Sequence, residues 1–195
     1  AQLVANDISI PVTINNDYHL PNFVNENTLV IASSFSGNTE ETLAALKIAQ
    51  NKGAEIACIT SGGKMLEIAI NNKYNHIVLP TERSPRAMLS YSLTQQFFLL
   101  KHYNLIENDF IQKIQNAIAL LNLEIENIKT EANNIANSIL NKTAVIYSEA
   151  NFEGVAIRLR QQLNENAKVL CWHHALPEMN HNELVGWAGG NEEKA

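Results

Sequence analysis

Serine and threonine side chains stand together with a glycine and an asparagine in the stretch SSFSGNTEETL, residues 33 to 43. The stretch follows the apolar run TLVIA and precedes an amphipathic run. A turn from a strand into a helix presents backbone N–H groups and a partial positive charge, which together favour phosphate. Ser34, Ser36 and Thr39 can donate hydroxyl hydrogen bonds, and Gly37 lets the backbone approach a ligand. These residues predict a phosphate site.

A helix cap is the alternative interpretation of the same residues. Asn38 or Thr39 could cap the helix, and Glu40 and Glu41 suit its positive end. The stretch matches neither G-x-x-x-x-G-K-[ST] nor G-x-G-x-x-G, so nucleotide binding is disfavoured. The local chemistry puts phosphate binding only slightly ahead of a cap.

Two later stretches carry basic side chains after predicted strands. TSGGK contains Lys64, which could face an anion, although a plain strand–helix loop is the stronger interpretation. RSPRAML contains Arg83 and Arg86, which could clamp a charged ligand, and Pro85 suits a helix start. An arginine at a helix start is more often a surface residue.

The stretch LNENAK places Glu165 near the end of a predicted helix. A carboxylate there meets an unfavourable dipole, and partial burial would raise its pKa toward the range of a general base. A solvated acid on a fraying turn is the alternative, and the stretch alone favours it.

Histidines and acids gather in WHHALPEMNHNEL, which contains His173, His174, His181, Glu178 and Glu183. The spacing is neither H-E-x-x-H nor a Cys/His finger, so a metal site is disfavoured. Acid–base use of one histidine fits better, and a structural role for two of them is the alternative.

Short β-branched runs alternate with amphipathic runs, which predicts an α/β fold with a doubly wound parallel sheet. Apolar residues at steps of three, four and seven indicate one long helix, or two with a bend, over 109–141. We expect strands at 8–14, 28–33, 55–60, 76–80, 143–148 and 168–173, and helices at 38–53, 64–72, 86–103, 109–141, 152–167 and from 180.

Composition excludes several classes of protein. The net charge is −6 without a Lys/Arg-rich run, which disfavours nucleic-acid and anionic-membrane surfaces. No apolar run is long enough to span a membrane, and no signal peptide is evident. Cys58 and Cys171 lie in apolar runs, which predicts buried reduced thiols and a cytoplasmic protein, with a disulfide as the alternative.

In this order and at these separations, SSFSGNTEETL, TSGGK, SPRAML, NENAK and LPEMNHNE resemble sugar isomerase (SIS) domain proteins. The resemblance extends from about Leu29 to Trp187. It is closest to the bifunctional phosphoglucose/phosphomannose isomerase branch, because NENAK followed by P-E-x-x-H-N is specific to that branch. A three-layer αβα SIS fold is implied.

The resemblance implies roles for individual residues. The sugar phosphate would be bound in the first loop by Ser34, Ser36, Gly37, Asn38 and Thr39. Arg86 would stabilise the enediolate, and Glu165 would move the proton between C1 and C2. His181 would assist ring opening from the neighbouring subunit, which implies a homodimer.

The implied function is the aldose–ketose isomerisation of hexose 6-phosphates without a metal or other cofactor. A non-catalytic SIS module that senses phosphosugars is the second hypothesis, but it leaves NENAK and PEMNHNE without a purpose. A third is another SIS enzyme, such as an aminosugar synthase, which should lack the NENAK region.

The resemblance also implies a domain division. We expect a first SIS domain over 1–104, a connecting helix over 105–141 and part of a second SIS domain over 142–195. Family members carry a glycine-rich loop similar to GGSGIGG just before the matching region and a catalytic lysine beyond its end. We therefore expect a fragment of a longer enzyme, with an incomplete active site of its own.

Overall fold

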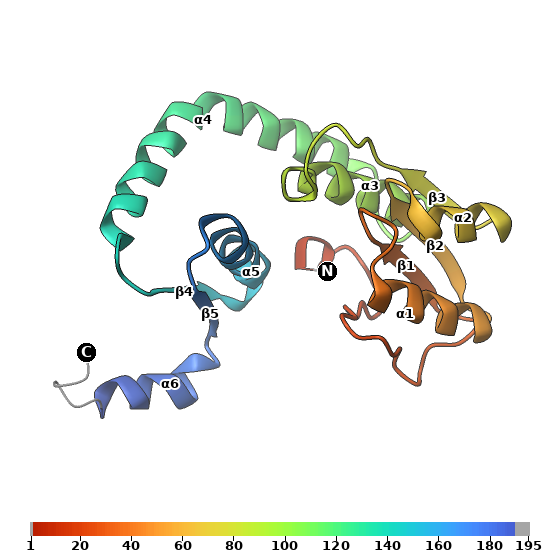
Figure 1. The fold of residues 1–195 in the computed structure, drawn as a ribbon, viewed down its shortest axis with the longest axis horizontal. Helices are drawn as coiled ribbons and strands as arrows, with labels where there is room; N and C mark the ends of the chain where they lie inside the picture. The colour runs from red at the N-terminus through yellow and green to blue at the C-terminus, as the bar shows by residue number, and fades with distance from the viewer. Residues whose placement is uncertain (1, 190–195) are drawn as a thin grey trace. The chain divides into compact units, whose positions relative to one another are not determined.

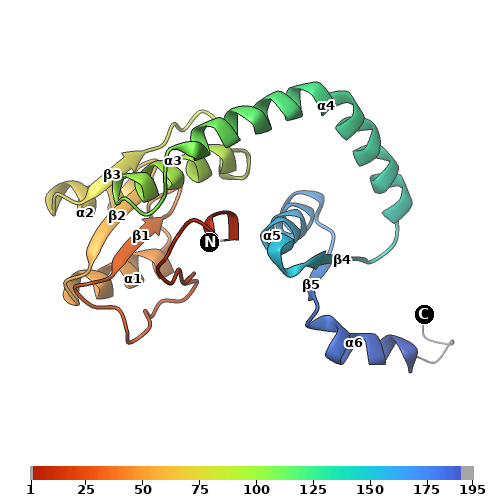
Figure 2. The ribbon, with the colours of Figure 1, turned by 180° about the vertical axis from the view of Figure 1, so that it is seen from behind.

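The computed structural model describes residues 2–189, and the predicted second domain therefore extends beyond the described residues at 190–195. The chain forms two compact units: Leu3–Gln112 belong to the first, and Gln2 together with the chain from Lys113 onwards belongs to the second. Figures 1 and 2 show the elements of both units from opposite sides.

The first unit contains a three-stranded parallel sheet in the order β1-β2-β3. Each strand is connected to the next by a helix, as the alternating sequence pattern predicts. A short 3₁₀ turn, η1, precedes the sheet. The elements of this unit are η1 (Gln2–Val4), β1 (Leu29–Ser33), α1 (Glu40–Asn51), β2 (Glu55–Thr60), α2 (Gly63–Asn71), β3 (Asn75–Val78), η2 (Pro85–Ala87) and α3 (Leu89–His102).

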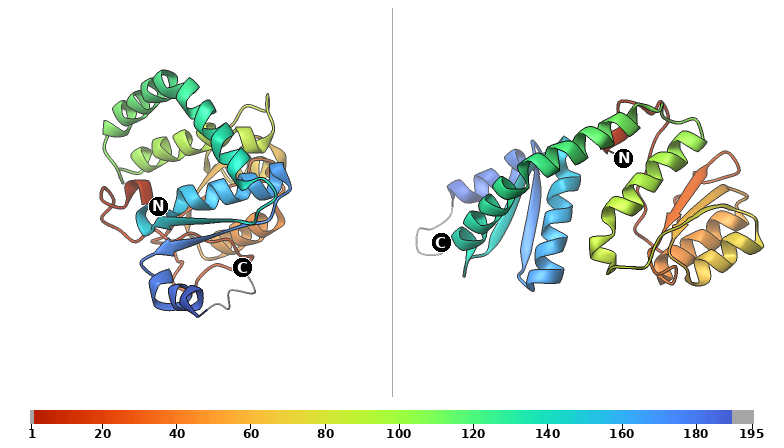
Figure 3. Two further views of the ribbon diagram at one scale, coloured as in Figure 1. Left: turned by 90° about the vertical axis from the view of Figure 1, so that its left-hand side faces the viewer. Right: turned by 90° about the horizontal axis from the view of Figure 1, so that it is seen from above.

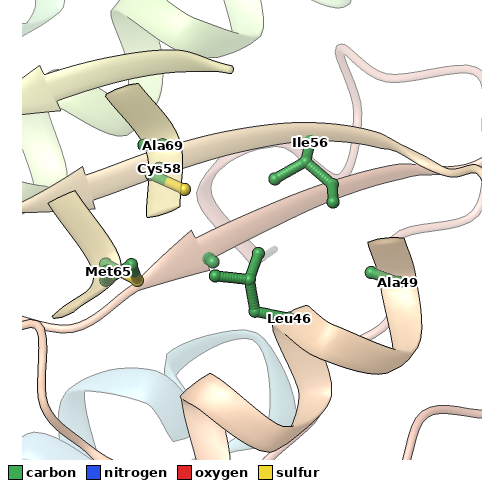
Figure 4. Close-up of a cluster of buried hydrophobic side chains, with 7 residues drawn as sticks. Leu46, Ala49, Ile56, Cys58, Met65 and Ala69 are labelled. Carbon is green, nitrogen blue, oxygen red and sulfur yellow. The ribbon is translucent and has the colours of Figure 1, made fainter. Parts of the chain in front are cut away.

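One face of this sheet is covered by α1 and α2. Ile56 and Cys58 of β2 point toward this face, because alternate residues of a strand share a side. Figure 4 shows these two side chains among those of both helices. The cluster of buried residues comprises Ala32, Leu46, Ala49, Ile56, Cys58, Met65 and Ala69.

The opposite face is covered by α3. Ala57 and Ile59, the alternate residues of β2, pack with Leu79 and with Leu99 of α3. The central strand is therefore buried on both faces, which is why its sequence EIACIT is continuously apolar rather than alternating. Helices on both faces of a parallel sheet confirm the predicted three-layer α/β architecture.

The second unit contains two parallel strands, with Tyr147 of β4 opposite His174 of β5. Figure 3 shows α5 alongside this strand pair. The long helix α4 is continuous, which agrees with the first of the two alternatives that the sequence leaves open, one helix or two with a bend. The remaining elements of the chain are α4 (Asp109–Ile139), β4 (Ala144–Glu149), η3 (Ala150–Phe152), α5 (Glu153–Gln162), the π-helical turn η4 (Leu163–Ala167), β5 (Cys171–Leu176) and α6 (Met179–Ala188).

The predicted strand at 8–14 is absent from the structure, and that prediction is wrong. Pro11 cannot donate a ladder hydrogen bond, and the apolar side chains of Ile10, Val12 and Ile14 are exposed. The alternation of apolar residues resembles a half-buried strand, but in this structure no sheet edge accepts the segment.

The predicted strand at 168–173 is displaced toward the C-terminus. The helix predicted over 152–167 is a regular α-helix only as far as Gln162, and it continues as the π-helical turn η4. Lys168 then adopts a left-handed conformation with φ of 59°. The strand consequently starts at Cys171 and extends to Leu176. The helix predicted at 86–103 is similarly interrupted at Met88, between η2 and α3.

Both cysteines are free and buried, which confirms the prediction of reduced thiols. Burial raises the pKa of the Cys58 thiol to about 11. Among the described helices, none is long and apolar enough to cross a membrane.

Candidate functional site

The loop between β1 and α1 is folded around the buried side chain of Ser34. The Ser34 hydroxyl lies 2.7 Å from the Thr39 hydroxyl and accepts a hydrogen bond of 3.1 Å from the Gly37 N–H. The Ser34 N–H donates to the carbonyl of Ile59 on the adjacent strand, at 3.1 Å. These contacts attach the loop to the carboxyl end of the sheet, where parallel α/β sheets bind ligands.

Thr39 occupies the N-cap position of α1, as the cap interpretation predicts. Its side chain makes no capping hydrogen bond, however, and its hydroxyl faces Ser34 instead. The positive end of α1 therefore lacks a side-chain cap from Thr39, and Glu40 and Glu41 occupy its first turn. The missing capping bond from Thr39 is compatible with a ligand at this helix terminus, whereas Glu40 and Glu41 offset part of its positive charge.

The loop between β2 and α2 supports the first loop through hydrogen bonds. The N–H of Ser61 donates to the carbonyl of Phe35 at 2.9 Å, and the N–H of Met65 donates to the carbonyl of Gly37 at 2.9 Å. Asn38 connects the loops further, because its Oδ1 accepts from the Lys64 N–H at 3.1 Å. The stretch TSGGK therefore braces the predicted phosphate loop.

Gly37 and Gly63 allow the two loops to touch. Gly37 has φ of 67°, and a Cβ built on it would lie 1.8 Å from the carbonyl oxygen of Gly62. Gly63 has φ of 68°, and its Cβ would lie 2.4 Å from the carbonyl oxygen of Ser36. Both positions require glycine for backbone conformation and for space.

The side chains of Ser36 and Asn38 are exposed at the outer part of this loop. Asn38 is nevertheless engaged, since its Nδ2 donates to the carbonyl of Ser36 at 3.2 Å. Arg86 lies in η2 of the same unit, with its side chain exposed. The first unit thus contains every predicted phosphate residue and the predicted enediolate partner.

Glu165 lies at the centre of the π-helical turn η4 in the second unit. The two asparagines beside it fix the turn: Asn164 Oδ1 accepts from the Cys171 N–H at 2.8 Å, and Asn166 Nδ2 donates to Gln162 Oε1. The side chain of Glu165 itself is exposed. Within the described residues the carboxylate is therefore solvated, as the alternative interpretation of this stretch expects, and it projects from a turn held by its neighbours.

His181 lies in the first turn of α6, and its side chain is exposed. The other two histidines of this region lie on β5. His173 is 3.8 Å from a carboxylate oxygen of Glu153, and His174 is 3.1 Å from one of Glu183. Within residues 2–189, no three His, Cys, Asp or Glu side chains are grouped to hold a metal ion.

Four side chains form a cluster that the sequence did not reveal, and we call it the Glu183 cluster: Tyr147, His174, Glu183 and Trp187. Glu183 Oε1 accepts hydrogen bonds from the Tyr147 hydroxyl and, at 3.1 Å, from Trp187 Nε1. Trp187 Nε1 also lies 3.3 Å from the Tyr147 oxygen. Glu183 and Trp187 follow Tyr147 by 36 and 40 positions, and no spacing rule connects residues so far apart in sequence. Only the fold brings these three side chains together.

The Glu183 cluster predicts an acid transition. The hydrogen bond from Tyr147 is the main cause that lowers the pKa of Glu183 below its ordinary 4.5. Because the folded pKa is depressed, the stabilisation is present above pH 4.5 and is lost as the pH falls through the folded value. In a Trp172→Phe background, Trp187 fluorescence should show this transition below pH 4.5, and Glu183→Gln should abolish it. A transition that persists in Glu183→Gln would assign it to another group.

Comparison with known proteins identifies both parts of the chain. Residues 16–103 match the family model of the SIS domain. Residues 128–195 match the model described as the bacterial phospho-glucose isomerase C-terminal SIS domain.

Named relatives match over most of this chain. A protein of Caldicellulosiruptor bescii named bifunctional phosphoglucose/phosphomannose isomerase is 39% identical over 190 residues, which are 94% of this chain and 56% of that protein. A Sulfolobus acidocaldarius protein named D-glucosamine-6-phosphate 4-epimerase is 38% identical and is matched over 83% of this chain and 51% of its own length.

A solved structure, the C-terminal domain of glucosamine-fructose-6-phosphate aminotransferase from Francisella tularensis, shares the fold. It has a TM-score of 0.66 and 18% identity, and the match covers 86% of this chain and 51% of that one. The chain spans about half the length of the curated relatives it matches. With SIS models matching both of its parts and relatives similar over nearly all of its length, this chain belongs to the sugar isomerase (SIS) domain family.

Proposed function

We propose that the protein containing this chain converts fructose 6-phosphate reversibly into glucose 6-phosphate, into mannose 6-phosphate or into both. The loop after β1 supports this function most strongly, because it combines several hydroxyl groups with an α1 terminus that Thr39 does not cap. The relatives named bifunctional phosphoglucose/phosphomannose isomerase support this choice of reaction.

The phosphate is assigned to the first unit. Ser34, Ser36 and Thr39 contribute hydroxyl groups, and the N–H groups at the start of α1 add their partial positive charge. Gly37 and Asn38 act chiefly through the loop shape, because both are engaged by the loop after β2. Holding the phosphate orients the sugar for reaction at its other end.

The proton transfer is assigned to Glu165. In the aldose-to-ketose direction its carboxylate removes the C2 proton, a cis-enediol(ate) forms, and the same group returns a proton to C1. Arg86 stabilises the negative charge that develops on the enediolate oxygen. His181 opens the sugar ring by moving the proton of the C1 hydroxyl to the ring oxygen, while the bond between C1 and the ring oxygen breaks and the C1 carbonyl forms.

The assembly and location of the enzyme are further parts of the proposal. The proposed enzyme is a homodimer in which His181 comes from the neighbouring subunit, and its location is cytoplasmic. Its proposed domains are 1–104, 105–141 and 142–195. Their support is the family resemblance.

A 4-epimerase is the second candidate, because the relative with that name is 38% identical, between isomerase relatives at 39% and 37%. Incubation with fructose 6-phosphate and, separately, with glucosamine 6-phosphate distinguishes the two. Isomerisation yields an aldose phosphate from the ketose, whereas epimerisation at C4 changes only the aminosugar. A protein inactive on both but binding either would support the phosphosugar-sensing alternative.

Thr39→Val should weaken the binding of glucose 6-phosphate by about tenfold or more, because a hydrogen bond to a charged group is lost. The helix should remain intact, since the Thr39 side chain makes no capping bond. Calorimetric titration measures the effect, with Thr42→Val on the same helix as the matched control. Equal affinities for the wild type and Thr39→Val would remove Thr39 from the phosphate site.

A further inference from the structure

The Glu183 cluster lies between α6 and the two strands of the second unit. Tyr147 and His174 are register partners on β4 and β5, so they occupy the same face of the strand pair. Their rings stack with centroids 6.0 Å apart. The third and fourth members, Glu183 and Trp187, are one helical turn apart on α6 and face those two side chains.

Glu183 is the hub of this cluster, because both of its carboxylate oxygens face partners. Oε1 accepts from Tyr147 and Trp187. Oε2 lies 3.1 Å from His174 Nδ1, where it makes no hydrogen bond within the described residues and forms an ion pair only when that histidine is protonated. One carboxylate therefore contacts both strands and its own helix.

Apolar packing attaches α6 only weakly within the described unit. Met179 is the one buried residue of this helix, at its first position. Leu184, Val185 and Trp187 are 53%, 68% and 65% exposed. The orientation of α6 about its own axis thus depends on polar contacts, and the Glu183 cluster supplies the cross-links to the strands.

The same helix carries His181 two residues before Glu183. Successive residues of an α-helix are about 100° apart, so residues two apart are about 200° apart and point in nearly opposite directions. When Glu183 faces the strands, His181 must face away from them, and its side chain is indeed exposed. A rotation of α6 that released Glu183 would turn His181 away from its present direction.

We propose that Glu183 is a positioning residue that fixes the rotation of α6 and thereby the direction of His181. The inference rests on the proposed function in one respect, the ring-opening role of His181. The attachment of α6 by Glu183 does not depend on it.

The experiment uses Glu183→Gln, which retains the shape of the side chain but loses its charge. Two measurements are made on the polypeptide that carries this chain: amide hydrogen exchange, and isomerisation of hexose 6-phosphate. Exchange in α6 should become at least about tenfold faster, while exchange in α5 is unchanged. The kcat should fall by about tenfold or more with KM within about twofold, because a displaced His181 affects turnover rather than the phosphate loop.

A double variant tests whether Glu183 acts through His181. If it does, adding Glu183→Gln to His181→Ala should cause no further loss of kcat, since coupled residues are not additive. A full additional loss in the double variant would overturn the proposal and show a general structural effect. Tyr147→Phe, which removes one partner of Glu183, should reproduce part of the increase in α6 exchange.

Glu178→Gln is the matched control, because it removes a negative charge close to His181 without touching the Glu183 cluster. An equal fall in kcat in Glu178→Gln would indicate a charge effect and overturn the positioning role. Unchanged α6 exchange in Glu183→Gln would overturn it as well, even in an active isomerase. If the wild type lacked isomerase activity but Glu183→Gln still loosened α6, the attachment would stand and the proposed function would fail.

Discussion

Replacing Glu165 with glutamine is expected to lower kcat for the interconversion of fructose 6-phosphate and its aldoses by about 10²–10⁴-fold. The amide has nearly the same shape as the carboxylate but cannot accept a proton from carbon. The turn should keep its structure, because Asn164 and Asn166 hold it and the Glu165 side chain is exposed. Affinity for the phosphosugar should be retained, because the proposed phosphate loop lies in the first unit.

Steady-state kinetics and titration with glucose 6-phosphate together check this prediction. Glu149→Gln, which neutralises another exposed acid of the second unit, is the matched control and should keep full turnover. Wild-type turnover in Glu165→Gln would show that another residue is the base. Loss of binding together with turnover would show instead that the substitution disturbs the fold.

Gly37→Ala is expected to destabilise the first unit by about 3 kcal/mol or more and to abolish phosphosugar binding. The substitution has two costs, because alanine disfavours φ of 67° and its Cβ would lie 1.8 Å from the carbonyl oxygen of Gly62. The backbone of the loop after β2 would have to move, which would break the hydrogen bond from the Met65 N–H to the Gly37 carbonyl.

Gly53→Ala separates these two costs. Gly53 has φ of 70°, almost the same as Gly37, but the atom nearest to a Cβ built on it would be 3.9 Å away. Denaturant unfolding should therefore show a loss of only about 1–2 kcal/mol for Gly53→Ala, with phosphosugar binding intact. Equal losses in the free energy of unfolding of Gly37→Ala and Gly53→Ala would mean that the close contact between the two loops does not contribute to stability.

The sheet of the first unit could be predicted because the residues of each strand form a recognisable apolar run. Continuous apolar runs predicted β1 and β2, and the residues after them predicted the loops that the structure places at the carboxyl ends of those strands. Segment 8–14 has the alternating pattern of a half-buried strand but forms no strand, because pairing depends on an available sheet edge and not on the segment alone. Periodicity indicates which side chains could be buried, and the partner decides whether they are.

The residues of the candidate site could be proposed from the sequence, but the contacts that their side chains make could not. Asn38 was expected to bind substrate, whereas its side chain connects the loops after β1 and β2. Asn164 and Asn166 stand in the sequence only as neighbours of Glu165, yet they hold the turn that presents it. Asn38 contacts Lys64 on the next loop, 26 positions along the chain, and Asn164 contacts Cys171 only because a π-helical turn separates them. Residue type and spacing do not encode such contacts.

Transfer of deuterium from the solvent to a sugar carbon distinguishes isomerisation from the simple binding of a phosphosugar. The polypeptide that carries this chain is incubated with fructose 6-phosphate in deuterated water, and the aldose phosphates formed are examined by NMR. A base that moves a proton between C1 and C2 exchanges it with solvent, so we expect glucose 6-phosphate, mannose 6-phosphate or both, with deuterium at C2. The absence of any aldose phosphate under conditions where fructose 6-phosphate binds would contradict the proposed isomerisation.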